Sequence, residues 1–581
     1  MGRTHVRGRP TEAIISTILW DYDAGLRLPN ELDSPRYEPT REIRIPVERE
    51  HNRGTGATIA HDVRKKLDPV LCVILDSACR NIRVFRDRGR LKDDVLLEMP
   101  EQRNESEIQE RQTGGDDYER VQHRRSRVGQ VRVPVVPRGV QFRPMRIPID
   151  TISLPNGLFV TLSEDHTAPI VAVNLWYHVG SANERPGRTG FAHLFEHMLF
   201  QGSADVEANE HFELVQRAGG TLNGSTWLER TNYYETVPSN QLELALWLEA
   251  NRMGKLLPAM TQQKLDTQRE VVMNERRWTM DNQPYGTWME KLPALCFPPE
   301  HPFHHSLIGS MEDLTAASLD DVANFFATYY TPDNAVLSIA GDFDPAEARR
   351  IIEKHFGQIP RGKGKPSLPD MSLPPLFGQW KREVVPDDVM LPRLFLAFRS
   401  PAFGTDEYYA ASVCGAVLGL RNASRLRRRL VLERQIAAEA SAFTYDLSKG
   451  SDLLVVDVTA RPGIQAEQLE QEVAHEIDTL VRDGVEAEEV ERSVAVIQTS
   501  FVSALQEAGE RADRLSMFAT YFGKPQLVND EVDRYRAVTA DAVNAFVQER
   551  LGENNRASLL YVARDENPGA LVGAGAATEA L

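Results

Sequence analysis

The sequence predicts an α+β protein in which one domain occurs twice, each copy a mostly antiparallel sheet packed with helices. Two segments 221 residues apart alternate apolar with polar or small residues, as strands with one buried face do. They contain Val173, Leu175 and Tyr177, and then Leu394, Leu396 and Phe398. At the same offset, residues 318–339 and 539–561 each run from a capping residue through an apolar helix into a strand. Coincidence between two helix–strand junctions is the alternative, but a shared offset at both ends favours a repeat.

The repeat divides the chain into five parts. Residues 1–144 form an extension that is expected to be largely disordered, because its later part is dense in charged residues and Gln and lacks apolar periodicity. The first copy occupies residues 145–362. Residues 363–378, rich in Pro, Gly and Lys, read as a linker. The second copy occupies residues 379–568, and a flexible tail, 569–581, ends the chain.

Composition excludes several classes of protein. The chain has 581 residues, of which 41% are hydrophobic, and a formal net charge of -17, which argues against a nucleic-acid-binding surface. No apolar run approaches the roughly 18 residues that span a membrane. Four scattered cysteines fit neither a disulfide framework nor a zinc ribbon. The start shows no signal peptide, so the chain as written is expected to be cytoplasmic, with a periplasmic location as the alternative if the start is misassigned.

The most informative motif is His193-Leu194-Phe195-Glu196-His197, which reads H-x-x-E-H. Two histidines at i and i+4 lie one turn apart on the same face of a helix, so both rings can reach one metal ion. Glu196 lies on that face and can reach a water molecule beside the metal. Two ligands and a base are the minimum for metal-assisted hydrolysis. The helix is expected to start after an N-cap at Thr189 and to stop at Gly202.

A catalytic zinc ion takes a third protein ligand from another element. Residues 261–280 read as a helix, with Glu275 on the same face as Gln268. Glu270 competes as a ligand, but it points elsewhere on that helix. Spacing alone leaves Glu275 evenly balanced between a ligand and a solvated carboxylate beside two arginines.

Further motifs give a resemblance. The H-x-x-E-H motif followed by a glutamate in a V-V-x-x-E-R-R helix is similar to the insulinase (pitrilysin) family of zinc peptidases, which includes the mitochondrial processing peptidases. The resemblance covers about residues 148–565 and is closest to the bacterial two-domain members. The other matching segments are Leu154-Pro155-Asn156-Gly157-Leu158, Val179-Gly180-Ser181, Asn232-Tyr233-Tyr234, His301-Pro302-Phe303, Ile308-Gly309-Ser310 and Pro332-Asp333-Asn334-Ala335.

The resemblance implies a zinc-dependent metalloendopeptidase with Zn²⁺ bound by three residues. They are His193, His197 and Glu275. It also implies that Glu196 is the general base, and that Asn223 and Gly224, on a short edge strand, contact the substrate backbone. Many relatives have a glutamate where this chain has Gln268, and most have Ala where it has Gly224. Taken without the resemblance, Asn223-Gly224 is more typical of a hairpin turn.

The second copy keeps the fold pattern without the metal residues. At the same offset, the three motif residues of the first copy become Cys414, Val417 and Leu418, and no carboxylate occurs near Val496. The second copy is therefore expected to cover the substrate. Several relatives supply an Arg and a Tyr to the oxyanion from a later domain, and the matching positions here are Leu430 and Ala437, which cannot donate from their side chains. Neighbouring arginines are left unassigned, because runs of arginine are usually solvated.

Single-chain relatives close four such domains into a chamber, and this chain has two. A homo- or heterodimer with a related subunit is therefore expected to complete the chamber. Peptides or unfolded polypeptides are the expected substrates. One alternative is a non-catalytic core or partner subunit, as some family members are. Another zinc hydrolase is a second alternative, but the P-C-x-x-C of deaminases is absent.

Overall fold

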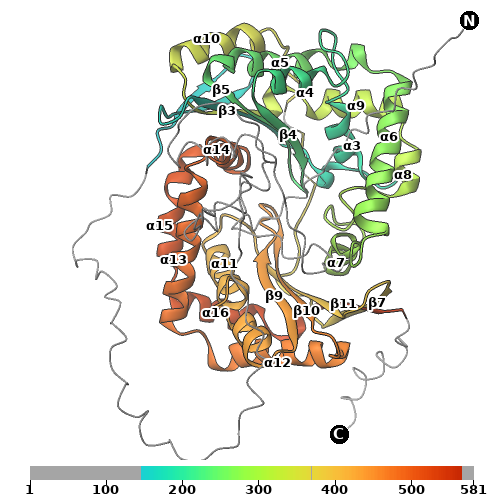
Figure 1. The fold of residues 1–581 in the computed structure, drawn as a ribbon, viewed down its shortest axis with the longest axis vertical. Coiled ribbons are helices and arrows are strands. Elements are labelled where there is room, and N and C mark those ends of the chain that lie inside the picture. The colour runs from blue at the N-terminus through green and yellow to red at the C-terminus, as the bar shows by residue number, and fades with distance from the viewer. Residues whose placement is uncertain (1–145, 365, 368, 565–581) are drawn as a thin grey trace, which may run out of the picture. The chain divides into compact units, whose positions relative to one another are not determined.

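The computed structural model describes residues 146–564, apart from residues 365 and 368. The predicted disordered extension and flexible tail lie outside these residues. Within them the chain forms two sheets (Figure 1). The positions predicted for the boundaries between the parts of the chain stay predictions.

The first sheet has six strands in the order β1-β2-β6-β3-β5-β4. Every neighbouring pair is antiparallel except β2 with β6, which is parallel. Strand β4 pairs only with β5 in the described part of the chain and lies at the edge of the sheet. The strands are β1 Asp150–Ser153, β2 Phe159–Glu164, β3 Ile170–Tyr177, β4 Thr221–Thr226, β5 Thr231–Pro238 and β6 Ala335–Gly341.

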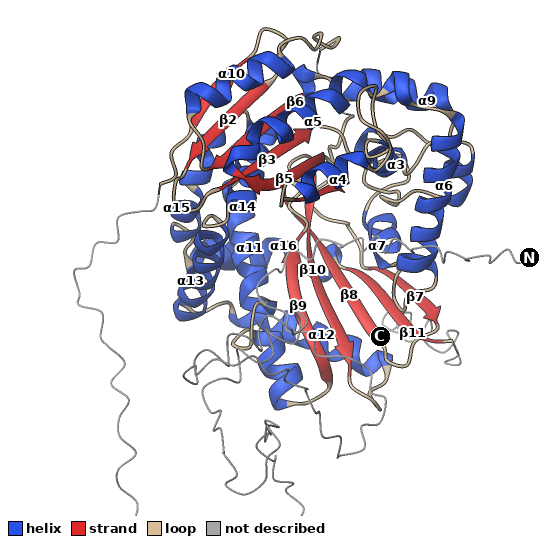
Figure 2. Ribbon diagram, turned by 45° about the horizontal axis from the view of Figure 1, so that its top comes forward, coloured by secondary structure: helices blue, strands red, loops and turns tan. Residues whose placement is uncertain are grey.

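The second sheet repeats this arrangement with five strands in the order β7-β11-β8-β10-β9. Figure 2 shows its strands side by side from β9 to β7. Again only one neighbouring pair, β7 with β11, is parallel. The strands are β7 Lys381–Asp387, β8 Arg393–Pro401, β9 Ala437–Thr444, β10 Ser451–Ala460 and β11 Ala557–Ala563.

The register of the strands confirms the repeat. Leu175 of β3 lies opposite Leu337 of β6, and Leu396 of β8 lies opposite Ser558 of β11. Both partners of the second pair are 221 residues further along the chain. The prediction of two homologous α+β domains, each with a mostly antiparallel sheet and helices, is therefore confirmed.

Helices cover the sheets. In the first copy they are α3 Phe191–Met198, α4 Glu210–Arg217, α5 Leu242–Lys255, α6 Gln262–Arg276, α7 Trp288–Cys296, α8 Met311–Thr315, α9 Leu319–Tyr329 and α10 Pro345–Phe356. In the second they are α11 Asp406–Gly419, α12 Ala466–Asp483, α13 Ala487–Ala504, α14 Ala508–Phe522, α15 Glu531–Arg536 and α16 Ala540–Arg550. None of these described helices is both long enough and apolar enough to cross a membrane.

Each copy packs one of its helices on the sheet of the other copy. Figure 1 shows α14, from the second copy, on one side of the first sheet, with α5 and α10 on the other. Ala512 of α14 packs on Ala172 and Ala340 in that sheet. In return α7 packs on the second sheet, where the ring of Trp288 stacks on Phe395 with centroids 4.7 Å apart. The exchange ties the metal-free copy directly to the sheet that carries the candidate site.

Candidate active site

The helix that carries the histidines starts one residue later than expected. The N-cap of α3 is Gly190, not Thr189, at φ 81. That conformation favours glycine, and a Cβ at Gly190 would lie 2.3 Å from the carbonyl oxygen of Ile308. Thr189 instead donates through its N–H and its hydroxyl to the carboxylate of Asp313. The helix also ends earlier than expected, at Met198 and not at Gly202.

A glutamate just before the helix takes the place of the missing side-chain cap. The carboxylate of Glu184 accepts hydrogen bonds from the N–H groups of Gly190 and Ala192, each at 2.8 Å. His305 contacts the same carboxylate at 2.9 Å. Burial raises the pKa of Glu184, although these partners oppose the shift. An acidic group at a helix N-terminus stabilises the helix, so Glu184 helps to fix α3 beneath the candidate site.

The structure brings the three expected metal ligands together. The Nε2 atom of His193 lies 3.7 Å from one oxygen of Glu275, and the Nε2 atom of His197 lies 3.3 Å from the other. One ligand atom from each of the three residues lies within 4.8 Å of the other two. Glu270, the competing residue, is exposed on α6.

The donor set fits a zinc ion. Glu275 Oε2 is buried, lies 3.3 Å from His197 Nε2 and accepts no well-aligned hydrogen bond from the described residues. Two imidazole nitrogens and one carboxylate oxygen are the donors that catalytic zinc prefers, with a position left open. The side chain of Gln268, which is buried, lies beside the His197 ring and acts to raise its pKa. A neutral amide therefore lies beside the ring of one expected ligand.

The surroundings favour a neutral His193 and an ionised Glu275. For His197, burial acts to lower the pKa, but Glu275 and Glu196 outweigh it and the pKa is raised. Burial lowers the pKa of His193, and Glu275 only partly opposes the shift. For Glu275, burial acts to raise the pKa, but both histidines outweigh it and the pKa is lowered. Neutral imidazole and ionised carboxylate are the forms that bind metals.

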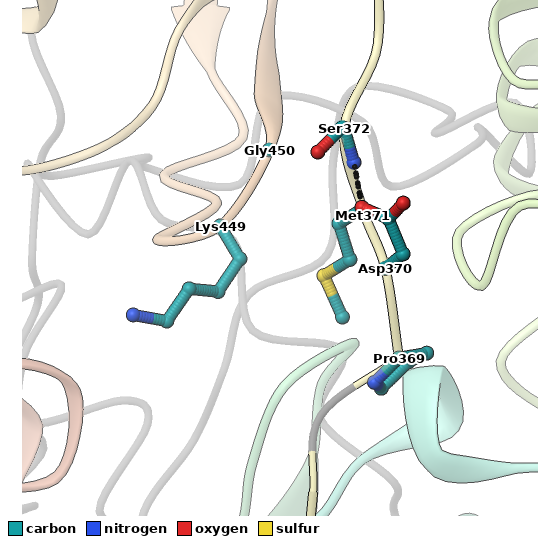
Figure 3. A pocket seen from close by; sticks show the side chains of 6 residues that line it. All are labelled: Pro369, Asp370, Met371, Ser372, Lys449 and Gly450. Carbon is teal, nitrogen blue, oxygen red and sulfur yellow. Dashed lines mark hydrogen bonds between the residues drawn. The ribbon is translucent and has the colours of Figure 1, made fainter.

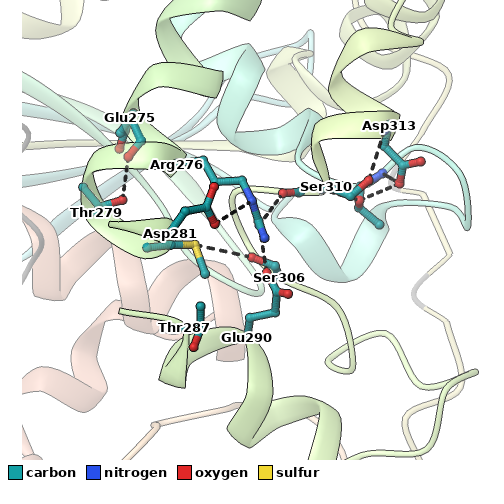
Figure 4. Close-up of polar contacts among 12 residues, drawn as sticks. Glu275, Arg276, Thr279, Asp281, Thr287, Glu290, Ser306, Ser310 and Asp313 are labelled. Carbon is teal, nitrogen blue, oxygen red and sulfur yellow. Dashed lines mark hydrogen bonds and ion pairs between the residues drawn. The ribbon is translucent and has the colours of Figure 1, made fainter. Parts of the chain in front are cut away.

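The end of α6 is fixed from three sides (Figure 4). Arg276 donates to the carbonyl oxygen of Gly309 at 2.7 Å and pairs with Glu290 at 2.8 Å and Asp281 at 3.6 Å. Residues Arg277–Asp281 continue the helix as a π-helical turn, and Thr279 in this turn donates to the backbone oxygen of Glu275. These contacts orient the last turn of α6, on which Glu275 lies.

Thr226, which lies outside the H-x-x-E-H motif, hydrogen-bonds Glu196, the expected base. Its hydroxyl donates to Glu196 Oε2 at 2.7 Å. Gly224 lies against the same side chain, because a Cβ at Gly224 would stand 3.1 Å from Glu196 Cγ. Thr226 comes two residues after Gly224 on β4, so the period of a strand could have indicated that both face Glu196.

Asn223 and Gly224 lie within β4 and not in a hairpin turn, so the turn alternative is wrong. Asn223 is paired with Tyr234, and Gly224 with Tyr233. Successive residues of a strand face opposite sides, so the Asn223 side chain does not share the Glu196 face. Its Oδ1 atom accepts the N–H of Gly224 at 2.9 Å. The substrate contacts assigned to these two residues stay a prediction.

The second copy offers no comparable group. Cys414, Val417 and Leu418 are buried in an apolar core, and among the described residues the two groups of potential metal ligands both lie in the first copy. Leu430 and Ala437 are fully buried. The neighbouring arginines already have partners, as with Arg425, which binds Glu489.

The other group of potential ligands, His211, Glu235 and Glu249, forms a buried polar cluster together with Arg252. His211 Nε2 lies 3.0 Å from Glu235, and Arg252 Nε donates to Glu249 at 2.9 Å. The guanidinium lies 4.1 Å from the centre of the Tyr233 ring. Arg252 supplies the positive charge that a metal would bring, so we interpret the cluster as a structural network.

The buried polar cluster predicts a pH effect on stability. Burial, and secondarily Arg252, lowers the pKa of His211 from 6.5 to about 3. The unfolded chain therefore binds this proton first, and the stabilisation present above pH 6.5 is lost as the pH falls towards 3. The contribution of His211 alone is on the order of 5 kcal/mol. Burial raises the pKa values of Glu235 and Glu249 to about 7, and these two groups act in the opposite direction. In denaturant titrations across this range, His211→Gln should flatten the acid side of the stability curve.

The matched control is His166→Gln. His166 is exposed, and its hydrogen bonds to Asp342 and then to Glu164 raise its pKa, so its stabilising effect is lost as the pH rises. This variant should keep the acid-side slope of the wild type. Parallel curves for His211→Gln and the wild type would contradict the assignment.

Comparison with known proteins agrees with this geometry. Residues 159–296 match the family model described as insulinase (peptidase family M16), and residues 316–497 match that described as the peptidase M16 inactive domain. The two ranges together span more than half of the chain. All the expected metal residues fall in the first range.

Named relatives include zinc proteases. The chain is 29% identical to the zinc protease PqqE of Helicobacter pylori over 374 residues, which is 64% of this chain and 83% of that one. A crystal structure of a protease from Helicobacter pylori aligns with a TM-score of 0.68 at 25% identity, over 72% of this chain and 100% of that chain. The mitochondrial-processing peptidase subunit beta of Blastocladiella emersonii is 27% identical over 268 residues, or 46% of this chain and 56% of that one.

Proposed function

Because the chain belongs to the insulinase family of peptidases, family M16, we propose that it is a zinc-dependent metalloendopeptidase. It hydrolyses peptide bonds in peptides or unfolded polypeptides. The proposal rests on one observation, the convergence of His193, His197 and Glu275 beside Glu196 and the edge strand β4. The match of residues 316–497 to an inactive domain does not oppose it, because the expected zinc ligands lie outside that range.

The reaction assigns one task to each group. A zinc ion held by His193, His197 and Glu275 would lower the pKa of a water molecule and polarise the peptide carbonyl. Glu196 accepts the proton of the attacking water and delivers it to the leaving amine. Thr226 donates to one oxygen of Glu196, so the other oxygen is left to handle the proton.

The edge strand supplies the substrate site. The outer edge of β4 carries backbone N–H and C=O groups that β5 does not pair. An extended peptide can add to this edge by main-chain hydrogen bonds, which bind without strict demands on sequence. A peptide in that position runs past Gly224, which lies against Glu196.

A chelator experiment tests the function. The purified full chain should contain one zinc per polypeptide and should cleave a pool of unstructured peptides. A chelator should stop the cleavage, and added zinc should restore it. Bound zinc without any cleavage would favour the non-catalytic subunit instead.

The oxyanion requires a donor that this chain does not supply from Leu430 or Ala437, both of which are buried and apolar. We therefore infer that a partner subunit, in a homo- or heterodimer, supplies it. The name of the Blastocladiella relative, a subunit, supports this inference by analogy. Sedimentation should show the cleaving species as a dimer, and a fully active monomer would refute the dimer.

A further inference from the structure

The turn between β4 and β5 is bound by the metal-free copy. The carboxylate of Glu229, in this turn, accepts the N–H of Ser448 at 2.6 Å and its hydroxyl at 2.9 Å. Ser448 lies in the connection between β9 and β10, the counterpart of the same turn in the second copy. Glu229 is 4% exposed and Ser448 is 8% exposed, so water does not compete for these hydrogen bonds.

The rest of the turn is fixed as well. The ring centres of Trp227 and Tyr445 lie 5.9 Å apart, and Leu228 packs in one apolar cluster with Tyr445 and Leu447. The N–H of Ala182 donates to the carbonyl oxygen of Leu228 at 2.9 Å. The turn is therefore held by side chains and by backbone, from both copies.

The connection on the other side is itself rigidly placed. The carboxylate of Asp452 accepts the N–H groups of Asp446 and Leu447, each at 3.2 Å. Figure 3 shows Lys449 and Gly450 opposite the linker residues Asp370, Met371 and Ser372, around a cavity of about 180 Å³. A Cβ at Gly450 would lie 2.2 Å from the backbone oxygen of Met371, so the linker packs tightly on this connection.

Burying Glu229 has a cost. Burial raises its pKa to about 7, and the hydrogen bonds from Ser448 oppose that shift. A buried carboxylate without close pairing to a cation destabilises a fold unless hydrogen bonds compensate. Such a group is retained more readily where it serves a further purpose.

The turn follows directly after Thr226, the residue that hydrogen-bonds the expected base, Glu196. Thr226, the last residue of β4, precedes Glu229 by three residues and donates to Glu196 at 2.7 Å. A displacement of the turn therefore moves both the substrate-pairing edge and the hydroxyl that holds Glu196.

We propose that Ser448 and Glu229 form a clamp through which the metal-free copy positions β4 and, through Thr226, the carboxylate of Glu196. This role rests on the proposed function. Ser448, Glu229 and Thr226 are positioning residues, since none of them needs to touch the substrate. The second copy thus holds the substrate strand of the first in its working position as well as covering the site.

The test compares two serines that bridge the same two copies. Ser448→Ala removes the hydroxyl that donates to Glu229. Ser516→Ala is the matched control, since Ser516 is also buried. It removes the hydroxyl by which α14 donates at 2.7 Å to Ser338 of β6, in the middle of the first sheet. The kcat and KM for a model peptide, the zinc content and the hydrogen exchange of the β4 amides are measured on the full chain.

Ser448→Ala should lower kcat about tenfold, the effect of one hydrogen bond to a charged group, and should speed hydrogen exchange in Thr221–Thr226. Zinc should stay at one per chain. Ser516→Ala should lower the melting temperature without changing either kcat or that exchange. Ser448→Thr, which keeps the hydroxyl, should restore kcat to within about twofold of the wild type, by the same hydrogen-bond magnitude.

Equal kcat and equal β4 exchange in Ser448→Ala and Ser516→Ala would overturn the clamp. A wild type that binds zinc but cleaves no peptide would overturn the proposed function alone. The exchange comparison still tests the clamp in that case, since it needs no turnover.

Discussion

Replacing Glu196 by Gln should abolish peptide cleavage and leave zinc bound. Gln keeps the shape of Glu196 and can still accept the hydrogen bond from Thr226, but it cannot take up the proton of water. Loss of a general base lowers a rate by about a hundredfold to ten-thousandfold, so kcat should fall by roughly a thousandfold. Metal analysis and peptide cleavage by the same sample measure the two effects together.

The control for this variant is Glu213→Gln on α4, where an exposed glutamate pairs with Arg217. It should cleave like the wild type. Full activity in Glu196→Gln would remove Glu196 from the mechanism, and loss of zinc from that variant would reassign it as a ligand.

Replacing Glu275 by Gln should release the metal. Glu275 supplies the one carboxylate among the three expected ligands, and its Oε2 atom is buried and lies 3.3 Å from His197 Nε2. Changes to residues that only support a ligand cost about 10- to 100-fold in metal affinity. Loss of a charged ligand should therefore cost at least about 100-fold. Competition with a zinc-binding dye measures the affinity directly, without any need for turnover.

Glu270→Gln is the matched control, because Glu270 lies on the same helix and is exposed. Its zinc affinity should equal that of the wild type. Equal affinity in Glu275→Gln would exclude Glu275 as the third ligand, and another residue would have to supply that ligand.

Much of the site could be predicted from local patterns. The spacing of His193 and His197 defines one helical face, and the structure places both rings on it, with centroids 4.8 Å apart. The helix expected at 261–280 is α6, Gln262–Arg276, continued by the π-helical turn. The shared offset of 221 residues predicted two copies of one domain, and the matching register of the two sheets confirms the repeat.

Contacts between distant elements could not be predicted in this way. Threonine is a common N-cap residue, but the hydroxyl of Thr189 donates to Asp313. Glu184 accepts the hydrogen bonds from the first N–H groups of the helix instead. An Asn-Gly pair is typical of a hairpin turn, but pairing with β5 makes Asn223 and Gly224 part of an edge strand. In the first case a partner far away in sequence outweighs the local preference, and in the second the pairing with the next strand does.

The sequence by itself determined which residues share a face, because the periods of helices and strands are set by the backbone and act within a few residues. It therefore determined the pair of histidines, the base beside them and the repeat. Only the tertiary structure decided that Glu275 meets both rings and that Ser448 binds the turn after β4. It also decided that α7 packs on the second sheet and α14 on the first. These contacts join elements whose separation depends on the packing of all the chain between them, and no local period records that packing.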